Sequence, residues 1–87
     1  MKKLVEEVSD EGLESLIGKR IAVWCLNYIY AGMLIGVNES DILLADAKVV
    51  YETGILDGDV WKDAQGLPND WYIRVSAIES YGEVDHA

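Results

Sequence analysis

The chain has 87 residues and a mass of 9.7 kDa, which fits one domain and excludes a second domain with a core of its own. Half of its residues are apolar (51%), too many for a disordered segment, yet a domain this small gains little stability from its own core, so we expect it to oligomerise. Seven Lys and Arg against sixteen Asp and Glu give a net charge of −9. This charge excludes a polyanion binder that works through an overall positive field, so any nucleic-acid site must be local.

The single cysteine, Cys25, excludes an internal disulfide, and no set of Cys and His has the spacing of a zinc site. Lys2 and Lys3 are followed by an acidic stretch instead of the apolar segment of a secretory signal. These features predict a cytoplasmic protein without metal or cofactor.

The first element in chain order is helical. Ser9 or Asp10 can cap a helix, and the apolar residues at 13, 16 and 17 then follow the helical spacing i, i+3, i+4. The pattern predicts a short α-helix over about 10–17, ended by Gly18.

Residues 21–37 form the strongest apolar run, which touches the lower length limit of a membrane helix. Its content of Val, Ile, Tyr and Trp is typical of strands, so we expect no membrane span but two strands joined by a tight turn at Asn27. The second strand, about 28–37, carries Gly32 and Gly36 on one face, where they allow a sharp bend and the approach of another backbone. A strongly bent strand predicts a small barrel.

Three further strands are expected, over residues 42–51, 71–74 and 77–81. Residues 54–70 combine Gly, Pro and Asp into an acidic excursion, either a hairpin extension or a mobile loop, and the polar tail 82–87 is expected to fray. The chain is thus expected to be mainly β, one domain over 1–87, with a short helix followed by five antiparallel strands.

Several segments resemble the Sm and Sm-like family: SLIGKR, IAVWCL, YAGMLIGVN, DILLADA and, near the end, IRVSAI. The fold positions of the first Sm motif are matched by Tyr30, Gly32, Leu34 and Val37, and the Ile-Arg of the second motif by Ile73 and Arg74. The chain is also similar to divergent Sm-like proteins in marine metagenomic sequence that are attributed to cyanobacterial phages. The resemblance implies a bent five-stranded barrel that assembles as a ring of about five to seven copies, in which the fourth strand of one subunit pairs with the fifth of its neighbour.

The resemblance also implies a site. Family members that bind uridine-rich RNA stack each base between a turn residue and the Arg of the second motif, while an Asn hydrogen-bonds the base edge. Here Ser40 takes the stacking position, and the Asn is replaced by Asp41 if the turn is one residue shorter or by Ile42 if it is not. The implied residues for single-stranded nucleic acid, with RNA favoured over DNA, are Asn38, Ser40, Asp41, Arg74 and Ser76.

Each of these residues also has a structural interpretation. Arg74 can pair with Asp41 across the barrel mouth, and the short polar residues can simply form turns. Trp61 is the aromatic to test, because exposure within the acidic excursion would indicate contact with a partner.

Two functions from different classes remain open. The first is a ring that binds single-stranded nucleic acid and acts in RNA or DNA processing or chaperoning. The alternative is an acidic structural or adaptor ring that binds a protein through the excursion. An enzyme is not expected, because Cys25 lies in an apolar strand and the one histidine, His86, lies in the tail.

Overall fold

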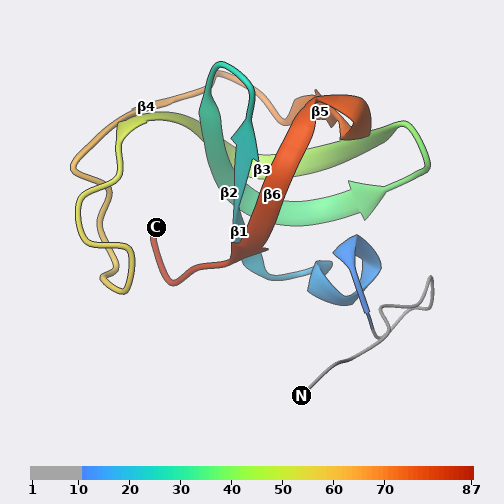
Figure 1. Ribbon diagram of the computed structural model, residues 1–87, viewed down its shortest axis with the longest axis horizontal. Coiled ribbons are helices and arrows are strands. Elements are labelled where there is room, and N and C mark those ends of the chain that lie inside the picture. The colour runs from blue at the N-terminus through green and yellow to red at the C-terminus, as the bar shows by residue number, and fades with distance from the viewer. Residues whose placement is uncertain (1–10) are drawn as a thin grey trace.

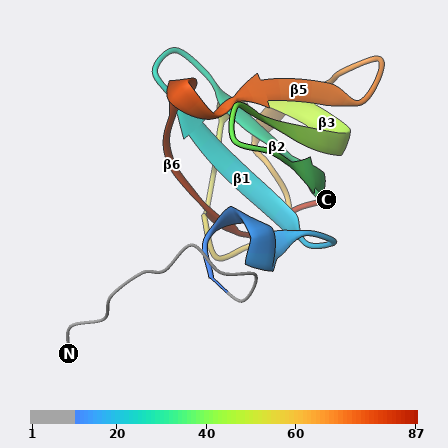
Figure 2. The ribbon, with the colours of Figure 1, turned by 90° about the vertical axis from the view of Figure 1, so that its right-hand side faces the viewer.

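A computed structural model describes residues 11–87 of the protein (Figure 1). Its elements in chain order are the 3-10 turn η1 (Leu13–Leu16), the strands β1 (Arg20–Cys25), β2 (Ile29–Val37), β3 (Asp41–Glu52), β4 (Asp63–Gly66) and β5 (Trp71–Arg74), the 3-10 turn η2 (Val75–Ala77) and the strand β6 (Ile78–Glu83). The strands pair in antiparallel fashion in the order β4-β3-β2-β1-β6, and β5 also pairs with β3. Figure 2 shows β5 lying along β3 and joined through η2 to β6, which runs beside β1.

The long strand β3 bends because a bulge divides it into two halves. Between the pairs Met33↔Ala45 and Ala31↔Lys48, Gly32 of β2 faces two residues of β3. One of these, Asp46, has φ of 50°, and such a bulge residue increases the local twist of the strand. A Cβ at Gly32 would lie 2.8 Å from the carbonyl oxygen of Ala45, so only glycine permits this approach. The expectation for position 32 is thereby confirmed.

The structure has six strands instead of the five expected. The additional strand, β4, lies inside the acidic excursion and pairs with the second half of β3, while β5 pairs with the first half. The two strands are separated at 67–70, where Pro68 has no N–H to donate to a ladder. The two halves of β3 therefore have separate partner strands, β4 and β5.

The predicted α-helix over 10–17 is also wrong, since the part within the described residues is only the four-residue turn η1; Ser9 and Asp10 lie outside them. Gly12 adopts φ 68° and ψ −154°, which is not helical, and no side chain caps the turn. Ile17 is already extended, and the Gly18 N–H donates to the Leu34 carbonyl at 2.7 Å. Hydrogen bonds to β2 therefore take the backbone groups that a longer helix would use.

Two apolar clusters lie on opposite faces of the sheet. The barrel core is formed by Ile21, Val23, Leu34, Ile42, Leu44, Ala47 and Ile73. The second core is formed by Ala22, Ala31, Val50 and Trp61. Residues 21–37 thus contribute strands to both cores, and no helix among residues 11–87 is long and apolar enough to cross a membrane.

The second core overturns the expectation of a frayed tail, and it answers the question of Trp61, whose exposure would have indicated contact with a partner. Trp61 is only 6% exposed and stacks on His86, with ring centroids 3.9 Å apart, while His86 is 2% exposed. Gly82 and Glu83 belong to β6, and His86 Nε2 lies 3.2 Å from the Ile55 carbonyl oxygen. The tail is ordered because its His86 ring covers the Trp61 indole.

Candidate nucleic-acid interface

Two turns that are distant in the sequence meet at one end of the sheet. The start of β3 pairs with the end of β5, with Asp41 opposite Arg74, and the Val75 N–H donates to the Ser40 carbonyl at 2.8 Å. The turn before β3 and the turn η2 therefore form a common pocket of about 470 Å³, which we call the Arg74 pocket. It is lined by Glu39, Ser40, Asp41, Arg74 and Ser76. Four of the five residues proposed from the sequence thus line one pocket.

The fifth residue, Asn38, does not line the Arg74 pocket. Its side-chain Oδ1 accepts hydrogen bonds from the backbone N–H of Ser40 and of Asp41, both at 2.8 Å, and from the Ser40 hydroxyl at 3.1 Å. Its backbone N–H donates to the Asp41 carbonyl at 2.9 Å. Asn38 therefore holds the turn in shape, as its structural interpretation had it.

The structure also decides which residue follows Ser40 into the pocket. Ile42 is buried in the barrel core, whereas Asp41 lines the pocket. The bulge at Asp46 shifts the alternation by one residue, so Ile42, Leu44 and Ala47 share one face despite their uneven spacing. Asp41, and not Ile42, is therefore the residue that lies beside Ser40 in the pocket.

The Arg74 side chain is exposed and makes no hydrogen bond or ion pair with any residue in 11–87. The pairing with Asp41 considered above does not form; Asp41 Oδ2 instead lies 3.3 Å from the Ser40 hydroxyl, whose single proton it shares with Asn38 Oδ1. A guanidinium without a carboxylate partner retains all five donors and its flat face for a ligand.

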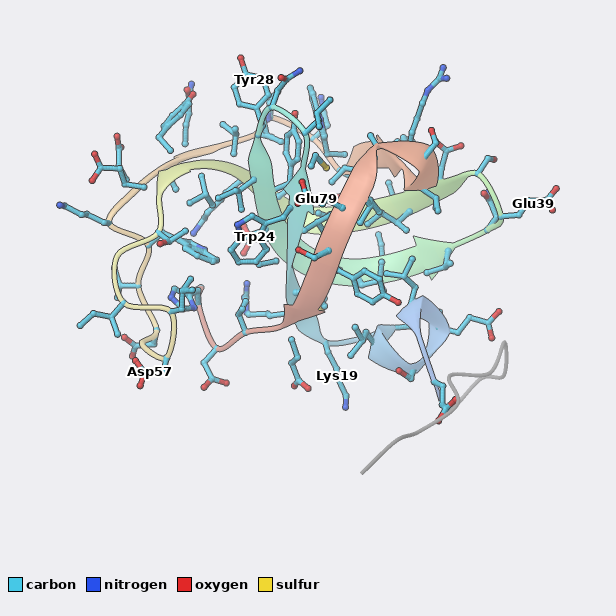
Figure 3. The ribbon with its side chains drawn as sticks, in the orientation of Figure 1. Lys19, Trp24, Tyr28, Glu39, Asp57 and Glu79 are labelled. Atoms are coloured by element: carbon cyan, nitrogen blue, oxygen red, sulfur yellow. The ribbon has the colours of Figure 1, made fainter. Side chains whose placement is uncertain are left out.

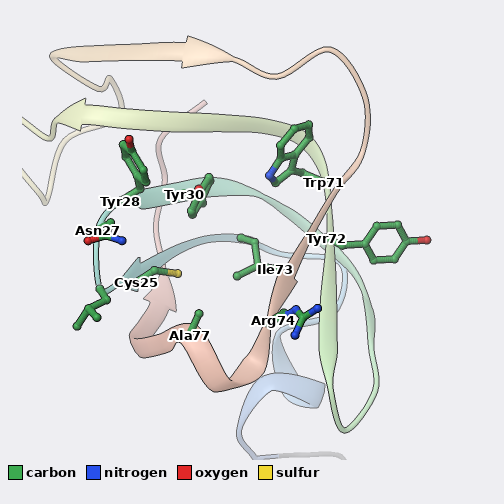
Figure 4. Close-up of a pocket in the computed structure, with 10 residues that line it drawn as sticks. Cys25, Asn27, Tyr28, Tyr30, Trp71, Tyr72, Ile73, Arg74 and Ala77 are labelled. Atoms are coloured by element: carbon green, nitrogen blue, oxygen red, sulfur yellow. The ribbon is translucent and has the colours of Figure 1, made fainter.

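A second pocket, which sequence analysis did not predict, opens on the other side of Arg74. Its volume is about 260 Å³, and it lies between the β1–β2 turn and β5 (Figure 4). The aromatic residues that line it are Tyr28, Tyr30, Trp71 and Tyr72. We call it the aromatic opening because of these four side chains. Trp71 and Ile73, which also line it, pair with Leu44 and Ile42 of the barrel core. Within the described part of the chain, β5 and β6 each pair with one strand only, so the barrel is unclosed at this point.

Two groups at the aromatic opening have altered acidity. Burial raises the pKa of the Cys25 thiol above its ordinary 9.0. Burial, and then the charges of Cys25 and Tyr28, raise the pKa of Tyr30 above its ordinary 10.0. The thiol is thus protonated at neutral pH. It packs against the barrel core, while His86 stacks on Trp61 of the second core, so the two do not form a nucleophile and base. Residues 11–87 include no group of three or more His, Cys, Asp or Glu side chains placed to hold a metal ion.

The fold is similar to that of a solved structure, the crystal structure of a heptameric archaeal Sm protein. The two chains superpose with a TM-score of 0.65 at 18% sequence identity, over 83% of this chain and 94% of that one. No family model and no curated protein matches the sequence. The chain therefore has an Sm-like fold, mainly β with a bent antiparallel sheet, as the resemblance implied.

Proposed function

We propose that the chain assembles into a ring of about five to seven copies and binds single-stranded nucleic acid, RNA above all, in Arg74 pockets repeated around the inner rim. The archaeal protein with the same fold is heptameric, which supports a ring. The unpaired edges of β5 and β6 support it as well, because each leaves backbone N–H and C=O groups for a strand of a neighbouring copy.

The observation that carries the binding proposal is an unpaired Arg74 beside Ser40, Asp41 and Ser76 in one pocket. The guanidinium can stack on a base or contact a phosphate. The Ser76 hydroxyl can donate or accept, and the Ser40 hydroxyl, whose proton is engaged by Asn38 and Asp41, can accept. The Asp41 carboxylate accepts hydrogen bonds only, so it selects base edges that present an N–H group. A single strand is the fitting ligand because its base faces and edges are free.

The negative charge of the chain limits this affinity. At −9 per copy, a ring repels phosphates, and Glu39 adds a carboxylate at the pocket itself. Binding must then rest on contacts within the pocket, which predicts modest affinity.

The test measures binding of labelled oligo-U, oligo-A and single-stranded DNA at low salt by fluorescence anisotropy. Arg74→Ala should weaken binding about tenfold, since a stacked base contributes about 1–3 kcal/mol. Lys62→Ala is the matched control, because it also removes one positive charge. Lys62 lies outside the pocket and pairs with Glu52 at 3.2 Å, so this variant should bind as the unchanged chain does. If all three oligonucleotides fail to bind, or if both variants lose affinity equally, the proposed site is wrong.

Binding of this kind fits a role in RNA or DNA processing or chaperoning in the cytoplasm, without catalysis by the chain itself. The phage-attributed Sm-like proteins are the proposed relatives of the chain.

A second candidate is an adaptor ring that binds a protein. Three exposed apolar side chains in the acidic excursion favour it: Ile55, Leu56 and Val60. A partner that is recovered from lysate after nuclease treatment, and lost when these three residues are changed to Ser, would support the adaptor over the nucleic-acid ring.

A further inference from the structure

The loop over residues 53–62, between β3 and β4, exposes apolar side chains although its backbone is well anchored. Ile55 is 73% exposed, Leu56 54% and Val60 71%. These side chains add nothing to either core, so their exposure has a cost in solubility that the fold does not require.

The anchors of the 53–62 loop are buried. Trp61 packs in the second core and stacks on His86, whose Nε2 in turn lies 3.2 Å from the Ile55 carbonyl oxygen. The Lys62 N–H donates to the Thr53 carbonyl at 3.3 Å, which closes the base of the loop. Because the backbone is ordered before any partner arrives, a partner that binds the exposed side chains loses little further loop entropy.

The charge on the loop restricts the kind of partner. Asp57 and Asp59 lie between the apolar side chains, and neither forms an ion pair with a cation of residues 11–87. The one cation of the loop, Lys62, is paired with Glu52. Nucleic acid and anionic membranes are repelled by such a surface, and a second copy would present the same acidic loop.

The loop is also remote from the Arg74 pocket. Asp57 of the loop and Glu39 of the pocket lie at opposite ends of the molecule in Figure 3. A ligand on the loop therefore does not compete for space with a ligand in the pocket.

We propose that the 53–62 loop is a docking site for a protein segment that is both apolar and basic, such as an amphipathic helix with Leu or Ile on one face and Lys or Arg beside it. The apolar face covers Ile55, Leu56 and Val60, and the basic residues pair with Asp57 and Asp59. The proposal rests on the adaptor candidate above and is independent of nucleic-acid binding in the Arg74 pocket.

The experiment titrates the full chain into a labelled synthetic peptide of Leu and Lys at helical spacing, at physiological salt, and follows anisotropy. The triple variant Ile55→Ser, Leu56→Ser, Val60→Ser should weaken binding at least about tenfold. The variant Asp57→Asn, Asp59→Asn should weaken it too and reduce its dependence on salt. Ile35→Ser, which changes an exposed apolar residue of β2, is the matched control and should bind as the unchanged chain does.

A control peptide with Ser in place of Leu separates specific docking from attraction between an acidic protein and any polycation. Equal binding of both peptides, or unchanged binding by the triple variant, would overturn the proposal, as would tighter binding to zwitterionic lipid vesicles than to the Leu-Lys peptide. Arg74→Ala should leave peptide binding intact, so failure of the nucleic-acid site and failure of the loop site give different results.

Discussion

At position 32 the backbone of β3 leaves no room for a side chain. In Gly32→Ala the new Cβ would lie 2.8 Å from the Ala45 carbonyl oxygen and 3.2 Å from the Ala47 Cα, and backbone atoms of a bulge cannot easily move away. We expect the free energy of unfolding to fall by about 1–3 kcal/mol, measured by urea denaturation.

Gly36→Ala is the control for this substitution, because the nearest atom to its Cβ is the Leu43 Cβ at an ordinary 3.6 Å. It should change the stability by less than about 1 kcal/mol. Equal losses in both variants would show that strand propensity, and not close approach at the bulge, explains the glycine at 32.

The raised pKa values of Cys25 and Tyr30 make stability depend on alkaline pH. Burial favours the neutral thiol and phenol, so each group adds stability below its ordinary pKa, 9.0 or 10.0, and this stability is lost as the pH rises through the higher folded value. The free energy of unfolding should therefore fall between about pH 8 and pH 11. It should fall less in the variant Cys25→Ala, Tyr30→Phe, and parallel pH profiles of the two proteins would contradict the assignment.

At the scale of elements, the second core depends on one aromatic pair. Trp61→Ala removes the ring that packs on Ala22, Ala31 and Val50 and leaves His86 without its stacking partner. We expect a loss of about 3–5 kcal/mol in the free energy of unfolding, a large part of the stability of a domain this small. Limited proteolysis should then cleave the tail first.

Leu26→Ala is the matched truncation, because Leu26 is exposed on the β1–β2 turn. Its effect should stay within about 0.5 kcal/mol. If Trp61→Ala is equally mild and the tail stays resistant to protease, the stacked pair does not hold the tail.

The elements that sequence reasoning placed correctly are those rich in strand-forming residues, namely β1, β2, β3, β5 and β6, the last of which runs two residues further than expected. It missed β4 because Asp63–Gly66 reads Asp-Ala-Gln-Gly and has no strand-forming residue; the strand exists because β3 is long enough to pair with it. The helix was overestimated because its spacing says nothing of the backbone angles at Gly12. The burial of Trp61 had no local signal, since its partner His86 stands in a polar stretch.

The candidate site, like the fold, could be predicted only in part. The turn residues of the Arg74 pocket could be predicted from the motifs, because each motif is contiguous and the fold brings the two together through the pairing of β3 with β5. The aromatic opening could not, because Tyr30 and Trp71 become neighbours only when strands from two parts of the chain pack together.

At the scale of the whole molecule, the unclosed barrel leads to a prediction about mass and stability. Light scattering should give about five to seven times the 9.7 kDa of the chain. The melting temperature should rise with protein concentration, because assembly stabilises the folded chain by mass action. A well-folded species of single-chain mass, with a melting temperature independent of concentration, would contradict the ring.

The strand β3 begins at Asp41 in the Arg74 pocket and ends at Glu52, just before the 53–62 loop. Its twelve residues connect the two proposed binding sites without an intervening linker, within a molecule whose longest dimension is 35 Å. A nucleic acid at one end and a basic peptide at the other would thus be kept at a constant spacing, and in a ring every copy would repeat it. The length of β3 would therefore set the distance between the two bound ligands.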